Sequence, residues 1–359
     1  MLYPEEYSTQ IFDDNLLLFS SMINDIRSAR KYIYLETYRF GEDAIGKRFR
    51  EALLEKAEEG IEIKLLVDAY GTKATEVFFG ELLKAGVKLC YFKKIKFFIS
   101  NTFARNHTRN HRKLLLIDDS ITYIGSSNLT AYSLSWRELN MRIKSPITHK
   151  FRGTFLHSMS QYKFYELAPF ERINIIQYHG YSIIQDTPST YFQPIRNYML
   201  KLIENAKSEI IAETPYFLPG NKIRKALVNA AQRGIQVTIY VPLFSDVPLI
   251  DLLRNKYLGP MFKAGVRWRF YKPDNLHAKS MIVDNKRFFV GSSNMDYRSF
   301  RYQYEIMLYG ENPKTIELLK EHIQLTDSLC SDFDYEKWKN VPFLYRFIEW
   351  IITPFRRLF

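Results

Sequence analysis

The chain has 359 residues, enough for about two domains, and its 46% apolar content excludes a disordered protein. Its two cysteines, Cys90 and Cys330, exclude a disulfide framework and suit a reducing compartment. The net charge of +12, from 51 Lys and Arg against 39 Asp and Glu, indicates an anionic partner, either nucleic acid or an acidic membrane surface.

The first segment, MLYPEEYSTQIFDD, is acidic where a secretory signal peptide would be basic. No apolar run reaches the roughly 18 to 20 residues that a membrane-spanning helix needs. We therefore expect an intracellular protein that is soluble or bound peripherally to a membrane.

The elements of the first half recur in the second half, in the same order. ARKYIYLETYRF (29–40), GIEIKLLVD (60–68) and AGVKLCYF (85–92) align with AKSEIIAETPYF (206–217), GIQVTIYVP (234–242) and AGVRWRFY (264–271). Apolar residues at helical spacing precede Gly60 and Gly234, which are typical left-handed residues after a helix. The β-branched runs that follow each glycine predict buried strands.

Alternating helices and apolar strands predict an α/β fold, in which helices flank a mostly buried sheet in each half. The two halves would pack about a pseudo-twofold axis, as an internal pseudo-dimer within a monomer. We expect a first repeat at 1–165, a second at 166–325, and a C-terminal amphipathic tail at 326–359.

An eighteen-residue polar pattern ends each half: HRKLLLIDDSITYIGSSN at 111–128 and HAKSMIVDNKRFFVGSSN at 277–294. The matching positions are mostly polar, which favours shared chemistry over a shared scaffold alone. On a strand, alternate side chains share a face, so each histidine lies beside the lysine two positions later. The aspartates have the opposite parity and fall in turns, where they either join the site or close the turn. The candidate catalytic residues are His111, Lys113, Asp118, His277, Lys279 and Asp284.

Each pattern ends in Gly-Ser-Ser-Asn, where glycine would let the backbone approach a ligand closely. The hydroxyl and amide side chains can bind oxygen atoms of a substrate. Together with the lysines they favour an anionic ligand, with phosphate as the leading candidate. The candidate substrate-binding residues are Ser126, Asn128, Ser292 and Asn294.

Two histidines on opposite sides of one phosphorus suit in-line displacement, in which one attacks and the other protonates the leaving oxygen. Lysines and asparagines would stabilise the phosphoryl oxygens, so we expect no metal and no cofactor. Each histidine also needs a carboxylate on its other ring nitrogen. Glu138 lies 27 residues after His111 and Glu305 lies 28 after His277, and this matched spacing makes them the candidates. Ordinary strand carboxylates remain the alternative.

The other histidines show no comparable pattern. His107 and His111 are four apart, but their stretch lacks the glutamate of a zinc-binding H-E-x-x-H helix. We expect surface or structural roles for the unpaired ones, which are His149, His157, His179 and His322.

The doubled H-x-K-x4-D and G-S-x-N pattern resembles the phospholipase D superfamily. ETPYFLPG, NLHAKSMIVD and GSSNMDYRSFRYQYE are similar to bacterial cardiolipin synthases, of a short type that lacks N-terminal membrane-spanning helices. The resemblance covers roughly residues 16 to 310 and implies phospholipase D-like repeats. It also implies cardiolipin synthesis by transphosphatidylation from phosphatidylglycerol, alone or with a second phospholipid. Family usage makes His111 the nucleophile and His277 the general acid. One departure is Gly125-Ser126-Ser127-Asn128, where the synthases often have Gly-Gly-x-Asn, which leaves the acceptor open.

Two segments could hold such an enzyme on the cytoplasmic side of the cell membrane. The loop 93–103 is basic and aromatic, and the tail 341–359 has apolar residues near helical spacing. Both would bind an anionic membrane surface, and the alternative for each is packing on the protein's own core.

Three competing functions differ in substrate or chemistry. A hydrolytic phospholipase D or a phosphatidylserine synthase would use the same histidines with another acceptor. The positive net charge also permits a nuclease, but superfamily nucleases are commonly short single-motif chains that dimerise. The aromatic residues of the two basic segments favour a membrane as the partner, so we expect no nucleic acid. A protein that only binds membranes would not need both catalytic sets.

Overall fold

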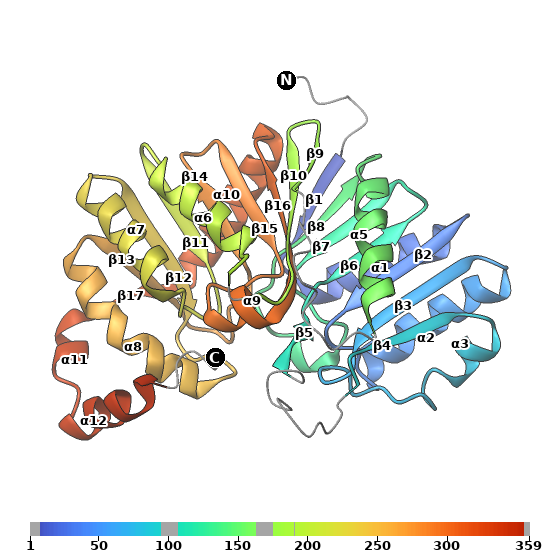
Figure 1. Ribbon diagram of the computed structural model, residues 1–359, viewed down its shortest axis with the longest axis horizontal. Coiled ribbons are helices and arrows are strands. Elements are labelled where there is room, and N and C mark those ends of the chain that lie inside the picture. The colour runs from blue at the N-terminus through green and yellow to red at the C-terminus, as the bar shows by residue number, and fades with distance from the viewer. Residues whose placement is uncertain (1–7, 95–106, 163–174, 190, 355–359) are drawn as a thin grey trace.

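The computed structural model describes residues 8–94, 107–162, 175–189 and 191–354, which form two α/β halves side by side (Figure 1). In the first half, seven strands form one sheet in the order β1-β8-β7-β6-β2-β3-β4. They are β1 (Ser8–Phe12), β2 (Tyr32–Thr37), β3 (Glu62–Asp68), β4 (Lys88–Phe92), β6 (Leu114–Ile117), β7 (Ile121–Gly125) and β8 (Asn140–Lys144).

The second half repeats this order and adds strands at both edges. The path is β17-β13-β12-β11-β14-β15-β16-β10-β9, and the short strand β5 (Arg109–Asn110) pairs with β16. The strands are β9 (Ile176–Tyr178), β10 (Tyr181–Asp186), β11 (Glu209–Glu213), β12 (Gln236–Pro242), β13 (Val266–Tyr271), β14 (Ser280–Val283), β15 (Arg287–Gly291), β16 (Gln303–Gly310) and β17 (Cys330–Asp332). The predicted duplicated α/β fold is confirmed.

Helices cover both faces of each sheet. Their bounds are α1 (Asn15–Ser28), α2 (Ala44–Glu58), α3 (Gly80–Lys84), α5 (Thr148–Gln161), α6 (Pro194–Glu204), α7 (Gly220–Gln232), α8 (Pro248–Lys263), α9 (Tyr297–Tyr302), α10 (Pro313–Ser328), α11 (Tyr335–Lys339) and α12 (Phe343–Ile352), with a 3-10 turn at Ala131–Ser133. The predicted left-handed residues after α2 and α7 are confirmed, because Gly60 and Gly234 have φ of 82° and 87°.

The core has an outer cluster in each half and a central one that joins the halves. α1 and α2 bury Phe19 and Phe49 against the first sheet, and α6 and α7 bury Met199 and Leu227 against the second. The central cluster contains Phe151 of α5, strand residues of both sheets, and residues of α10. The two halves therefore share one continuous apolar core, and this fixes the edges that meet at the site.

Candidate active site

The two histidines are held at the junction, each by the backbone of the opposite half. His111 follows β5, which pairs in parallel with β16, and its N–H donates to the carbonyl of Tyr304 at 3.0 Å. His277 follows Leu276, which bridges to Arg137, and its N–H donates to the Arg137 carbonyl at 2.7 Å. These two short parallel contacts are equivalent, so the duplicated chain places its two histidines in the same local geometry.

Each imidazole contacts the carboxylate of the opposite half. Nδ1 of His111 lies 2.9 Å from Oε1 of Glu305, and Nδ1 of His277 lies 2.8 and 2.9 Å from the two oxygens of Glu138. Both glutamates are fully buried. The matched sequence spacing indicated these two carboxylates by counting each from the histidine of its own half, but in the structure the partners cross between the halves. Neither half therefore contains a complete histidine–carboxylate pair.

The lysines share this buried region. Nζ of Lys113 donates to the carbonyl oxygen of His111 at 2.7 Å, and Nζ of Lys279 donates to that of His277 at 2.5 Å. Burial lowers the pKa of Lys113 to about 7 and that of Lys279 to about 8. Two desolvated ammonium groups beside the histidines favour an anion, because a bound anion would compensate their buried charge.

The two histidine–carboxylate pairs differ electrostatically. Burial holds the pKa of His111 well below its usual range, and it raises the pKa of Glu305 to about 8. Burial also lowers the pKa of His277, but Glu138 opposes that effect. The pKa of Glu138 stays below its usual range because His277 outweighs the effect of burial. The arrangement favours a neutral His111 and an ionised carboxylate beside His277, which are different states suited to different roles.

The glycines of the two Gly-Ser-Ser-Asn turns are required by the approach of a neighbouring strand. A Cβ on Gly125 would lie 2.4 Å from the carbonyl oxygen of Leu139, and one on Gly291 would lie 2.2 Å from that of Ile306. The close approach is therefore to the backbone of the residue after each of these glutamates, where the sequence had suggested a ligand. In this way the glycine lets that strand bring its carboxylate to the site.

The serines of these turns are fully buried and bind the same strands. Ser126 bonds to both backbone groups of Leu139, and the Ser292 hydroxyl donates to Glu305. By contrast, the side-chain oxygens of Asn128 and Asn294 are buried and have no hydrogen-bond partner within the part of the chain that the structure describes. We infer that the asparagines contact substrate and the serines hold the carboxylates in place.

The aspartates of the motif lie at the far ends of their strands from the histidines. Asp118 has φ of 54°, and its carboxylate accepts from the backbone of Arg30, Lys31 and Tyr32 at 2.6 to 3.0 Å. Asp284 accepts in the same way from the backbone of residues 207–209, and these donors lower its pKa to about 2 against the effect of burial. This geometry fits the turn-closing alternative, in which the aspartates join β6 to β2 and β14 to β11.

A buried ionic network that the sequence did not indicate supports the His277 side. His322 of α10 bonds through Nε2 to Glu213 at 3.1 Å and through Nδ1 to Asp13 at 3.2 Å. Arg137 bonds to Asp13 at 2.8 Å and to the His322 carbonyl at 3.1 Å. Since Arg137 precedes Glu138 and its own carbonyl binds His277, the network fixes both partners of that pair. His149, His157 and His179 are exposed.

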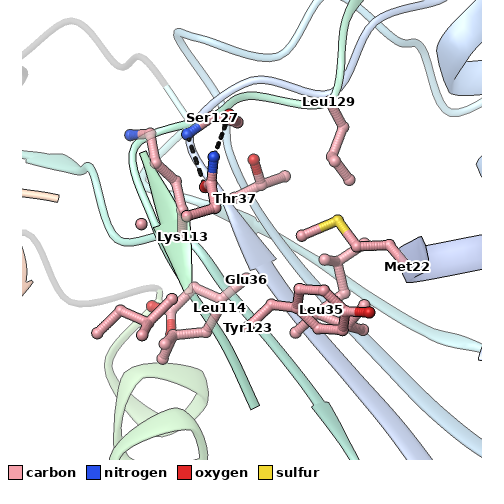
Figure 2. Close-up of a pocket in the computed structure, with 13 residues that line it drawn as sticks. Met22, Leu35, Glu36, Thr37, Lys113, Leu114, Tyr123, Ser127 and Leu129 are labelled. Atoms are coloured by element: carbon pink, nitrogen blue, oxygen red, sulfur yellow. Dashed lines mark hydrogen bonds between the residues drawn. The ribbon is translucent and has the colours of Figure 1, made fainter. Parts of the chain in front are cut away.

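A small cavity of about 10 Å³ lies inside the first half, with Lys113 and Ser127 bordering it from one side and Met22 from another (Figure 2). Its volume is close to that of one water molecule, so no phospholipid headgroup fits there.

Two α/β halves that each contribute one histidine and the other histidine's carboxylate define an enzyme of the phospholipase D superfamily. The family model described as "Cardiolipin synthase, PLD-like domain" matches residues 22–159 and 199–325, one segment in each half. A cardiolipin synthase of Clostridium perfringens is 30% identical over 98% of this chain and 76% of its own length. The chain belongs to this cardiolipin synthase family.

Further comparisons agree in family and in fold. The major cardiolipin synthase ClsA of Bacillus subtilis is 29% identical over 97% of this chain and 74% of its own length. The crystal structure of the phosphatidylserine synthase of Haemophilus influenzae superposes with a TM-score of 0.76, covering 100% of this chain and 96% of that chain. At 13% identity, this second likeness concerns the fold alone.

Proposed function

We propose that this enzyme is a phosphatidyltransferase that makes cardiolipin from two molecules of phosphatidylglycerol through a phosphohistidine intermediate. The observation that carries the proposal is the crossed arrangement of two histidine–carboxylate pairs with two buried lysines. It supplies a nucleophile, a proton donor and charge stabilisation to a single phosphodiester. The family relationship adds the phospholipid substrate class.

In the first step, neutral His111 attacks phosphorus through Nε2 while Glu305 accepts the hydrogen bond from Nδ1. The bond from phosphorus to the glycerol oxygen breaks, and His277 gives its proton to that oxygen. Binding of the anionic phosphodiester beside Glu138 favours the protonated form of His277. Lys113, Lys279 and the two asparagines stabilise the charge on the phosphoryl oxygens.

In the second step, a hydroxyl of another phosphatidylglycerol gives its proton to His277 and attacks the phosphorus. The bond from phosphorus to His111 breaks, which restores neutral His111 and releases cardiolipin. The sum of both steps converts two phosphatidylglycerols into one cardiolipin and one glycerol. The same histidine that protonates the leaving glycerol therefore deprotonates the acceptor.

The decisive experiment is mass spectrometry of the lipids that the purified protein makes from phosphatidylglycerol alone. We expect cardiolipin and glycerol in equal amounts, and His111→Ala or His277→Ala should nearly abolish both. Phosphatidic acid as the main product would instead assign a hydrolytic phospholipase D. No conversion of phosphatidylglycerol, with activity on cytidine diphosphate diacylglycerol and serine, would assign a phosphatidylserine synthase.

We also propose that helix α12 holds the enzyme on the membrane. Its charged residues face the protein: Glu349 is buried against Asn255 of α8, and the Arg346 guanidinium lies 4.1 Å from the ring centre of Trp338. Three of its apolar residues face outward: Trp350 is 70% exposed, and Phe347 and Ile351 beside it are also exposed. Docking on the core and membrane contact, weighed as alternatives from the sequence, are thus compatible on opposite faces of one helix.

The prediction that the loop 93–103 binds the membrane surface is wrong for its first residue, Lys93. Lys93 is buried, where Nζ donates to Thr108 at 2.9 Å, so this lysine cannot contact a membrane surface. Lys94 is exposed and pairs with Glu76. Residues 95–103 and Arg356 and Arg357 lie outside the described residues. Among the described residues, no helix is long and apolar enough to cross a bilayer.

A further inference from the structure

A polar cluster lies beside His277 and has no role in the steps above. Asp246, which follows β12, accepts from the Tyr216 hydroxyl at 2.6 Å and from Nδ2 of Asn275 at 3.1 Å. Asn275 is two residues before His277 and is 3% exposed, whereas the Asp246 carboxylate is at the surface. The side-chain oxygen of Asn275 is buried and has no hydrogen-bond partner among the residues that the structure describes. The cluster thus has two hydrogen-bond acceptors for a ligand: the exposed carboxylate of Asp246 and the buried, unsatisfied side-chain oxygen of Asn275.

Two observations connect the cluster with the active site. The carbonyl of Asn275 accepts from the N–H of Arg137, the residue before Glu138, so the cluster and the orienting carboxylate share one connection between the halves. The charge of Asp246 raises the pKa of both His277 and Lys279 against the effect of burial, which requires proximity.

The equivalent region of the first half has different chemistry. The aligned segments place Arg39 opposite Tyr216, and Arg109 opposite Asn275. Arg109 is buried 3.7 Å from the fully buried carboxylate of Asp68, and Arg39 lies over the ring of Tyr132. The two halves therefore differ at this point: a buried Arg109–Asp68 pair precedes His111, whereas an exposed carboxylate, Asp246, lies beside His277.

The second cluster suits neutral hydroxyl groups. A carboxylate repels phosphate, but it accepts strong hydrogen bonds from hydroxyls, and the phenol and the amide can bind a neighbouring hydroxyl. In the proposed function, the leaving glycerol and the acceptor glycerol both exchange a proton with His277. They must therefore occupy the same side of the phosphorus in turn.

We propose that Asp246, Tyr216 and Asn275 form a subsite for the glycerol headgroup, which holds the leaving glycerol in the first step and the acceptor glycerol in the second. This inference rests on the proposed transfer to an alcohol, and it adds where the alcohol binds and why a polyol is preferred. Asp246 binds a hydroxyl that does not react, and so aims the reacting hydroxyl at His277.

A competition between two acceptors tests the subsite. The full-length protein receives a phosphatidyl donor with a p-nitrophenol leaving group, together with glycerol and 1-propanol at equal concentrations. 1-Propanol has the same carbon chain without the two additional hydroxyls. The measured quantity is the ratio of the initial rates at which phosphatidylglycerol and phosphatidylpropanol form, before phosphatidylglycerol is itself converted into cardiolipin. This ratio cancels any change in overall rate, including one caused by an altered pKa of His277.

We expect the unaltered protein to favour glycerol, and Asp246→Asn to reduce that preference roughly tenfold, as loss of a hydrogen bond to a charged group does. Tyr216→Phe should reduce it less. Asp274→Asn is the matched control, because this exposed carboxylate bonds to Ser135 and to the backbone of Asn275, and it should leave the ratio unchanged. An unchanged ratio in Asp246→Asn, or no preference for glycerol in the unaltered protein, would overturn the subsite alone. Absence of both transfer products from the unaltered protein would overturn the proposed function itself.

Discussion

The crossing of the histidine–carboxylate pairs between the halves predicts that each glutamate serves the histidine of the opposite motif. Glu138→Gln should impair proton transfer by His277, although Glu138 is nearer to His111 in the sequence. Glu305→Gln should impair the nucleophile His111. Both substitutions keep the side-chain shape and remove the negative charge.

The expected size of the two effects differs at neutral pH. Glu138 is fully buried, makes two contacts below 3 Å to His277, and its pKa lies below the usual range, so the substitution removes a full charge. Removing a fixed charge that stabilises the transition state, here the imidazolium of His277, costs about 3 kcal/mol, which corresponds to a decrease in kcat of about 100-fold or more.

Glu305 already carries a proton in much of the free enzyme at pH 7, because burial raises its pKa to about 8. Glutamine resembles that protonated form, so Glu305→Gln should slow the first step only about tenfold at pH 7. The active form places the proton on Nδ1 of His111 and the negative charge on Glu305. At saturating substrate, the rate of the first step in the unaltered enzyme should therefore rise as the pH increases through about 8, and that rise should be lost in Glu305→Gln.

Pre-steady-state kinetics with a phosphatidyl p-nitrophenol donor separates the two glutamates. p-Nitrophenolate leaves without a proton donor, so Glu138→Gln should give a normal burst of one equivalent followed by slow turnover. Glu305→Gln should slow the burst itself. Glu317→Gln, which changes an exposed ion pair with Lys320, is the control and should behave as the unaltered enzyme. A slowed burst in Glu138→Gln with a normal burst in Glu305→Gln would refute the assignment of roles.

Four further outcomes are expected. Burial lowers the pKa of Lys113 to about 7 and of Lys279 to about 8, so the KM for a soluble short-chain substrate should increase as the pH rises above these values, because the free enzyme loses its phosphate-binding charges; a profile of KM against pH checks this. His322→Gln should lower the melting temperature most below about pH 6.5 and progressively less as the pH rises. The reason is that His322 has a raised pKa, and its stabilising charge is lost as the pH passes through that value. A difference in melting temperature that stays constant across several pH values would contradict this. Gly125→Ala should destabilise the protein by about 2 kcal/mol or more, since its Cβ would overlap the next strand, and a normal urea midpoint would contradict this. Trp350→Ser should weaken binding to phosphatidylglycerol vesicles about fivefold at both low and high salt. The control Tyr191→Ser, at an exposed aromatic residue that precedes α6, should not weaken it. Equal sedimentation of the unaltered protein and both variants with the vesicles would exclude α12 as the membrane contact.

The fold was predictable because its signals are local and occur twice. Apolar runs, helical stripes and glycine positions each depend on a few neighbouring residues, and the duplication allowed each half to be checked against the other. Glu138 and Glu305 were also found in this way, from their matched distance to the histidines. Their partners could not be found, because the crossing depends on two short contacts, Tyr304 with Asn110 and Arg137 with Leu276, that join distant parts of the chain.

Two other features of the structure could not be predicted from the sequence, for different physical reasons. His322 lies with Leu319, Ile323 and Thr326 on the buried face of α10, a helical spacing that predicts burial but does not reveal that Glu213 and Asp13 lie opposite. The cluster around Asp246 could not be predicted from the repeat, because the repeat marks only residues that are the same in both halves. Its neighbours Tyr216 and Asn275 stand opposite Arg39 and Arg109 in the aligned segments, so the repeat does not mark this cluster.

This difference between the halves explains why a duplicated chain suits an alcohol-transfer reaction. A symmetric site made of two identical halves would give both histidines the same surroundings, so nothing would fix which one attacks phosphorus. Within one chain, the buried pairs can stay equivalent in geometry while their surroundings change independently. Here burial favours neutral His111 with Glu305, whereas burial lowers the pKa of His277 less because ionised Glu138 and exposed Asp246 oppose it. The crossed carboxylates keep the halves dependent on each other, and the diverged surroundings give each histidine a separate role.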